Sequence, residues 1–456
     1  MRLKYTSLMV CLLLVGCNSL PGLNTDKLQN TPNKWTETNT LSDISDSWHE
    51  VKQDSHLNEV INIALNNNRA LQRKILEVQS AEQQLIISGA DLLPTLTSSL
   101  DYSEREQAGQ SESVSNYSLG LAIKYELDLW GKLSDSERQA SLNLMSLNES
   151  LKQQKLDLVY SVAKLWYELT EENQQQSLQS QRVSITKQNL DIIEKGYRQG
   201  LNSALDVYLG RNELNNEEAK LEEYKNNIKL LTRDLQQLMS IYPTGVYSVV
   251  GEFSNLSKFD DIGLPSDVIK RKPELQASWF KLLSQDAGLA FAHKQRFPSF
   301  NLSFSLDSSD ESFSNTIRFD DIGWNFIAGI TAPIFNAGKL KANEEKQRIA
   351  LKTLELEYLD LLDNTFTTIE NSLSTEQALK LRKKNISESA VNAKLAATLS
   401  FEQYKKGLVT YTTVLDAQKR SFDAQTAFIS IQNQLIQNRL SLYHALGDGF
   451  ATSTQE

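Results

Sequence analysis

The sequence predicts an α/β membrane protein built from an internal duplication, in which each half carries a pair of β-strands and a long helical hairpin. Three observations lead to this prediction. Segments such as 115–130 and 298–308 alternate between apolar and polar side chains. Residues 131–242 and 334–456 contain no proline and are rich in helix-forming residues. Matching motifs recur in the two halves at a constant offset of 207 residues.

The N-terminus carries the features of a bacterial lipoprotein signal. Two basic residues precede Leu8–Val15, an apolar run that is too short to cross a bilayer. The run leads into the sequence Leu-Val-Gly-Cys, which resembles a lipobox. We therefore expect residues 1–16 to be a cleaved signal peptide, Cys17 to be lipidated, and residues 17–55 to form a lipidated tail. The alternative is an ordinary secretory signal with an incidental cysteine.

Composition argues against several other classes of protein. A net charge of −10 disfavours a nucleic-acid partner. Four histidines, with no HExxH, CxxC or P-loop spacing, argue against an enzyme. The chain has only four methionines, so we expect no thioether relay for soft metals. No catalytic residue, metal site or cofactor is therefore expected.

The segment 115–130 has the clearest strand pattern. From Tyr117 to Leu129 its odd positions are apolar and its even positions are small or charged, so an extended strand would have one face of each kind. This pattern is typical of a transmembrane strand with lipid on one side and water on the other. Taken alone, the segment fits the edge strand of a soluble sandwich equally well. The apolar set is Tyr117, Leu119, Leu121, Ile123, Tyr125, Leu127 and Leu129.

Three further strands are expected, at about 94–105, 298–308 and 322–335, with loops rich in Ser and Asp inside each pair. Unpaired strand edges are not tolerated in lipid, because each unpaired backbone group costs several kcal/mol. Four strands cannot close a barrel, so the chain must oligomerise. A trimer would supply about twelve strands, which is within the range of bacterial outer-membrane barrels.

Each proline-free stretch predicts a hairpin of two helices, with apolar residues at heptad spacing. The stretches are interrupted at Gly200 and Gly407, each of which follows basic residues, and this is a signal for a helix C-terminus. We expect one hairpin over 131–241 and another over 338–446, with first arms roughly 100 Å long. The heptad positions are Leu214, Leu221, Ile228 and Leu235, and Leu415, Phe422, Ile429 and Ile436.

The hairpins belong to two structural repeats, 56–241 and 242–446, which are followed by a tail over 447–456. Four motifs in these repeats resemble one family, the TolC/OprM outer-membrane efflux channels in their lipoprotein, NodT-type branch. The resemblance covers roughly residues 55–447. The motifs are Tyr125–Lys132 (YELDLWGK), Ala332–Gly338 (APIFNAG), Tyr404…Gly407…Val414–Gln418 (VLDAQ after the tip), and Leu442–Gly447 (LYHALG).

The resemblance implies a TolC-like trimeric channel. A twelve-stranded β-barrel in the outer membrane would continue into a long α-helical coiled-coil barrel in the periplasm. The implied function is the exit channel of a tripartite efflux pump, which passively conducts drugs or other small molecules. A periplasmic adaptor and an inner-membrane RND-type or ABC transporter would be its partners, together with outer-membrane lipid.

Two alternative functions remain open. The exit duct of a type I protein secretion system shares the same architecture, and neighbouring genes would distinguish it. A periplasmic coiled-coil lipoprotein with a structural or tethering role belongs to a different class. Heat-modifiable migration and single-channel conductance would separate it from the two ducts.

The resemblance also implies roles for residues near the hairpin tips. Asp206 and Tyr404 match positions that interact across neighbouring hairpins in the closed state. Asp416 matches an acidic ring at the narrow end, and its alternative is a solvated carboxylate on a helix face. Thr413 stands where some members carry a second aspartate, and Val409 where some carry an arginine. The residues expected to contact the adaptor at the tips are Gly200, Leu201, Ser203, Gly407, Leu408 and Thr410.

Overall fold

A computed structural model describes most of the chain between residues 54 and 447. The expected signal peptide, Cys17, most of the lipidated tail and the C-terminal tail after Gly447 lie outside the described residues. No helix of the described part is both long and apolar enough to cross a membrane. The described ranges are 35–36, 54–106, 113–247, 253, 265–318 and 322–447.

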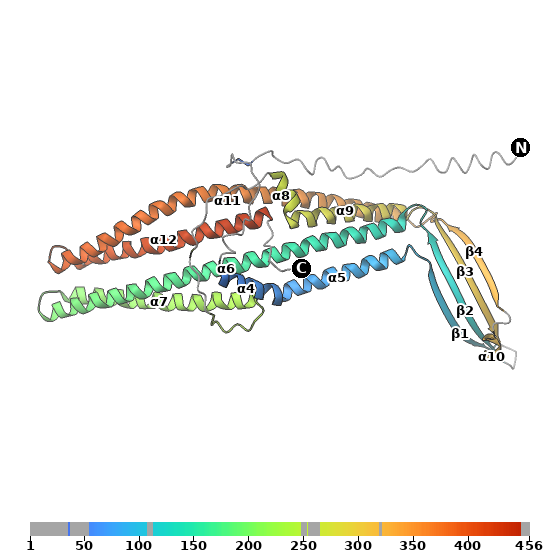
Figure 1. Cartoon of the computed structure of the whole chain (residues 1–456), viewed down its shortest axis with the longest axis horizontal. Coiled ribbons are helices and arrows are strands. Elements are labelled where there is room, and N and C mark those ends of the chain that lie inside the picture. The colour runs from blue at the N-terminus through green and yellow to red at the C-terminus, as the bar shows by residue number, and fades with distance from the viewer. Residues whose placement is uncertain are drawn as a thin grey trace. The chain divides into compact units, whose positions relative to one another are not determined.

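The described residues fall into two compact units, of which the first holds Gln79–Leu147 and Ser278–Leu359. This unit contains one antiparallel sheet in the order β1-β2-β3-β4, visible in Figure 1. The strands are β1 Thr95–Arg105, β2 Val114–Leu127, β3 Ser299–Asp310 and β4 Gly323–Thr331. Within the described residues β1 and β4 each have one partner strand, so the sheet has two open edges.

Two strands end earlier than the alternation indicates, β2 at Leu127 and β4 at Thr331. After β2 the chain turns at once, and Gly131 adopts a φ of 70°, which favours glycine. The Asp128 carboxylate accepts hydrogen bonds from the N–H groups of Leu133 and Ser134 in the first turn of the next helix. After β4, Pro333 lacks the N–H that a ladder requires.

The strand register places like side chains on the same face of the sheet. Leu121 pairs with Leu306, and its neighbour Ala122 pairs with Ser305. Directly paired residues point to the same side, so one face is mostly apolar across β2, β3 and β4 and the other is mostly polar. Ile327 is an exception, because it pairs with Ser303 on the polar face and is 54% exposed.

The helices form two hairpins, α6 with α7 and α11 with α12 (Figure 1). The first arms, α6 and α11, each contain 67 residues, about 100 Å at 1.5 Å per residue. The helices are α4 Ser55–Asn67, α5 Arg69–Ala90, α6 Lys132–Arg198, α7 Ala204–Leu238, α8 Pro265–Arg271, α9 Pro273–Lys294, α10 Phe313–Thr316, α11 Lys339–Lys405 and α12 Tyr411–Leu446.

The core of the second unit packs α4 against α6, α7 and α12. Leu57 and Ile61 of α4 are fully buried in a cluster with Trp166 of α6. The Trp166 indole N–H donates to the Asp54 carboxylate over 3.0 Å. The same carboxylate caps α4 by accepting from the N–H of Leu57. A single aspartate therefore both starts α4 and attaches it to α6.

A second cluster in this unit contains Trp35, which falls in the expected lipidated tail. Trp35 is 3% exposed and packs edge-to-face on Phe366 of α11, with ring centroids 5.7 Å apart. The N–H of Thr36 donates to the Glu370 side chain over 2.9 Å. These contacts attach this point of the tail to α11.

Candidate functional site

Both hairpins end in the same turn. In the first, the N–H of Gly200 donates to the carbonyl of Tyr197, and the N–H of Leu201 donates to the carbonyl of Gly196. The second repeats this pattern around Gly407 and Leu408. The two glycines have φ values of 78° and 72°, so each ends its helix in the left-handed conformation of a Schellman motif. Leu201 and Leu408 are consequently exposed at the tips, by 77% and 69%.

The second arm of each hairpin begins with a side-chain cap. Ser203 accepts from the N–H of Asp206, and the Asp206 carboxylate accepts from the N–H of Ser203, which makes a capping box. In the other hairpin the Thr410 hydroxyl accepts from the N–H of Thr413. Asp206 and Thr413 are equivalent positions of the two repeats, and each is the third residue of its helix.

One hydrogen bond joins the two hairpins near these caps. The Tyr404 hydroxyl donates to the Asp206 carboxylate over 3.3 Å. Desolvation, followed by the negative charge of Asp206, raises the pKa of Tyr404 to about 12. The Tyr404 ring lies 5.4 Å from that of Tyr411, which is 1% exposed and whose pKa is also raised by burial. The link therefore has an apolar surrounding on one side, and Tyr404 remains a donor at neutral pH.

Asp416 lies on α12, beyond the helix start at which Thr413 is placed. Its side chain is 63% exposed, and its carboxylate lies 3.0 Å from the Arg420 guanidinium one helical turn further along α12. Sequence reasoning did not consider Arg420, although the spacing of four residues on a helix indicates such a pair. Within one chain, the charge of Asp416 therefore has a cation beside it.

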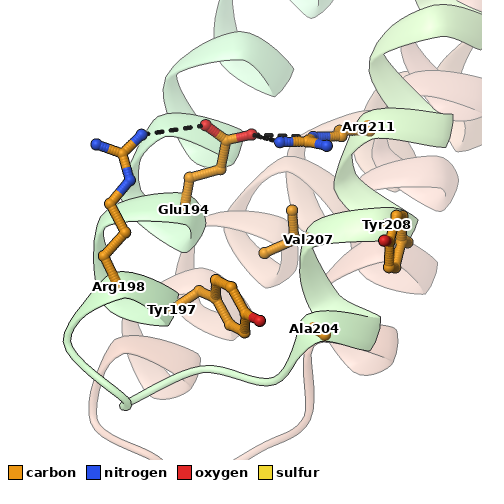
Figure 2. Close-up of a pocket in the computed structure, with 7 residues that line it drawn as sticks. All are labelled: Glu194, Tyr197, Arg198, Ala204, Val207, Tyr208 and Arg211. Carbon is orange, nitrogen blue, oxygen red and sulfur yellow. Dashed lines mark hydrogen bonds and ion pairs between the residues drawn. The ribbon is translucent and has the colours of Figure 1, made fainter.

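The tip of the first hairpin holds a cavity of about 240 Å³ (Figure 2). Glu194 lies between two arginines, 2.8 Å from Arg211 and 3.9 Å from Arg198. Sequence reasoning missed this group, although Glu194 and Arg198 have the four-residue spacing of a helical ion pair. The cavity is lined by Glu194, Tyr197, Arg198, Ala204, Val207, Tyr208 and Arg211.

Further along the hairpins, polar contacts join α6 to α12. The Arg182 guanidinium donates to the carbonyl of Phe422 and, over 2.6 Å, to the hydroxyl of Thr426. Burial lowers the pKa of Arg182. The Gln175 amide donates to the carbonyl of Thr426, and Glu171 accepts from Ser430. Sequence reasoning also missed this row, because polar residues on a helix are usually solvated.

The described residues contain no group of three or more His, Cys, Asp or Glu side chains that could hold a metal ion.

Comparison with known proteins gives a consistent set of matches. A family profile described as "Outer membrane efflux protein" matches residues 60–240 and 264–448. The chain is 25% identical over 465 residues to the probable efflux pump outer membrane protein TtgC of Pseudomonas putida, covering 97% of this chain and 94% of TtgC. It is 24% identical over 452 residues to the cation efflux system protein CusC of Escherichia coli, covering 97% of each.

A solved structure has the same fold. The crystal structure of the Campylobacter jejuni CmeC outer membrane channel matches with a TM-score of 0.84 and 22% sequence identity. The match covers 96% of this chain and 95% of CmeC.

Proposed function

Since the chain belongs to the outer membrane efflux protein family, we propose that it is the outer-membrane exit channel of a tripartite efflux pump. In this role it conducts drugs or other small molecules passively. Selection of the substrate belongs to the inner-membrane transporter that delivers it.

The observation that carries this proposal is the two-faced sheet with open edges. Its apolar face gathers Leu121, Leu306 and Trp324 in paired positions, and Trp324 is 72% exposed. An exposed apolar sheet face is unfavourable in water and favourable against lipid. The open edges of β1 and β4 require partner strands in a membrane. Further copies of the chain would supply them, and three copies would make about twelve strands around a polar lumen.

The long hairpins suit the periplasmic part of such a channel. With first arms of 67 residues, they can extend a conduit well beyond the membrane. The exposed tip residues Leu201 and Leu408, with the glycines and caps beside them, would contact the periplasmic adaptor. An RND-type or ABC transporter would complete the pump, and acylated Cys17 would add a lipid anchor in the outer membrane.

The gate would lie at the tips. The hydrogen bond from Tyr404 to Asp206 would hold the two hairpins together in the closed state. Asp416, repeated by threefold symmetry, would form an acidic ring that attracts cations. Thr413 would contribute an uncharged side chain to this gate.

A complementation assay tests the proposed function. The gene is deleted from its native host, and the full chain is returned on a plasmid. We expect the deletion strain to become sensitive to a panel of antibiotics and dyes, and the plasmid to restore resistance. The purified protein should migrate as a heat-modifiable oligomer and form conducting pores in planar bilayers. An unchanged sensitivity profile combined with loss of a secreted protein would instead indicate a secretion duct, and a protein without pores would indicate a tether.

A further inference from the structure

The two hairpin tips are alike in backbone but different in chemistry. At the offset of 207 residues, Glu194 of the first tip corresponds to Phe401 of the second, and Arg211 corresponds to Gln418. In the second tip the rings of Phe401 and Tyr404 stack with centroids 6.3 Å apart, next to Tyr411. Aromatic rings thus occupy the second tip, whereas the first has a cavity of about 240 Å³.

The cavity has an excess of positive charge. Glu194 places one carboxylate oxygen 3.0 Å from Nε and 2.8 Å from Nη2 of Arg211. Arg198 approaches the other oxygen at 3.9 Å, which is too long for a hydrogen bond. Its side chain is 75% exposed. The single carboxylate of Glu194 therefore faces two guanidinium groups, and Arg198 retains N–H donors that can bind an additional anion.

The remaining wall is apolar and aromatic. Val207 is 7% exposed and closes the cavity between the two helices, as Figure 2 shows. Tyr197 and Tyr208 are 49% and 67% exposed. Exposed tyrosines and arginines around a cavity are the composition of an interaction hot spot. A planar guanidinium beside an aromatic wall suits a carboxylate that is carried by a partly apolar segment.

We propose that the cavity of the first tip is a specificity site that receives an acidic side chain, together with a neighbouring apolar one, from the periplasmic adaptor. This inference rests on the proposed function, because it assumes that an adaptor docks at the tips. Arg198 pairs with the incoming carboxylate, and Arg211 positions Glu194 so that Glu194 does not neutralise Arg198 fully. The second tip lacks the arginine pair, and its Lys405, at the position equivalent to Arg198, pairs with Glu402 at 2.6 Å, so this tip contributes apolar contact without this charge selection.

Photocrosslinking identifies the occupant of the cavity. Benzoylphenylalanine replaces Tyr208 in the full chain, which is expressed in the native host and irradiated, and the crosslinked peptides are sequenced. We expect a peptide from the adaptor with an Asp or Glu within about four residues of the attachment point. Crosslinks to a second copy of this chain, a peptide with no acidic residue, or no crosslink at all would each overturn the proposal.

Charge reversal tests the chemistry. Arg198→Glu should weaken binding of the purified adaptor to the purified channel by about tenfold, which corresponds to about 1.4 kcal/mol. The matched control is Lys195→Glu, because Lys195 lies one turn earlier on α6, is 65% exposed and does not line the cavity. Lys405→Glu is the control at the equivalent position of the second tip. Both controls should remain within twofold of wild type.

A charge swap completes the test. Reversing the crosslinked acidic residue of the adaptor to Lys should restore binding and drug resistance to the Arg198→Glu channel. Wild-type binding by Arg198→Glu, or no restoration by the swap, would overturn the carboxylate site while leaving the exit channel intact. A wild-type chain that confers no resistance would contradict the proposed function itself.

Discussion

The Tyr404 hydroxyl donates to the Asp206 carboxylate over 3.3 Å, and this bond joins the second hairpin to the first. Asp206 has two roles, because the same side chain completes the capping box of α7 with Ser203. Replacing Asp206 by Ala would therefore damage the helix start as well as the link. A substitution at Tyr404 therefore tests the hydrogen bond between the hairpins more directly than one at Asp206.

Tyr404→Phe should loosen the closed tip and leave assembly intact, because it removes the hydroxyl and keeps the ring. The lost bond is worth about 0.5–1.5 kcal/mol per chain, or up to about 3 with a charged acceptor. We expect a higher resting conductance in planar bilayers and greater antibiotic entry into cells. The control is Tyr242→Phe, at a residue that is 84% exposed. A Tyr404→Phe channel as closed as wild type would show that the bond does not hold the gate.

The link should also respond to alkaline pH. The pKa of Tyr404 is raised from its ordinary value of 10.0 to about 12. A raised pKa means that the folded state retains the proton longer than the unfolded state does, so the contribution is complete below pH 10 and is lost as pH rises towards 12. Near-ultraviolet difference titration should show one tyrosine fewer at high pH in Tyr404→Phe. Ionisation of Tyr404 at its ordinary pKa would contradict the buried link.

The faces of the sheet can be tested with two adjacent residues. Leu121→Arg places a charge on the apolar face and should cost about 2–4 kcal/mol per chain near the middle of the bilayer. Ala122→Arg places the same charge on the face that carries Ser305 and should still assemble. Heat-modifiable migration of the two variants provides the measurement. Equal assembly would mean that lipid does not cover the apolar face.

Asp416 and Arg420 should have opposite effects on cation block. Three copies of Asp416 around a narrow opening would concentrate negative potential, and Arg420 at 3.0 Å offsets part of it. Asp416→Ala should weaken block by polyvalent cations added from the periplasmic side, and Arg420→Ala should strengthen it. High salt should reduce both effects by screening. Unchanged block in both variants would make Asp416 a solvated surface carboxylate.

Cys17→Ser should abolish acylation, because a hydroxyl cannot accept the thioether transfer. Labelled palmitate should appear in the wild-type protein and be absent from the variant. Each buried acyl methylene contributes about 0.8 kcal/mol to membrane attachment, but the barrel should retain the variant in the membrane. Equal labelling of the two proteins would rule out the lipobox.

The resemblance to TolC/OprM channels is confirmed, since the outer membrane efflux profile matches both repeats. The predicted mixture of four strands with long helical hairpins is also confirmed. Local features of sequence explain this success. The alternation of apolar and polar side chains has a period of two residues, and a glycine ends a helix through hydrogen bonds within a single turn, so both features can be recognised in a short stretch of sequence.

Contacts between groups that are far apart in the sequence were not predicted. Arg182 and Phe422 are 240 residues apart, yet the guanidinium reaches that carbonyl from within the packed hairpins. In the sequence, Arg182 looks like one more solvated charge on a helix. The contact of Trp35 with Phe366 is equally invisible, because a lone tryptophan in a polar tail carries no periodicity.

The sequence by itself determined the strands, the helices, the glycine turns and the duplication, because each depends on neighbours within a few turns of the chain. Only the tertiary structure decided which side chains meet at the two equivalent tips. Arg211 meets Glu194 across the first hairpin, while Phe401, Tyr404 and Tyr411 occupy the second. The physical reason is that a charge or ring acquires its role from the groups packed around it. Which groups surround it depends on how the helices cross, and the spacing along one helix does not determine this.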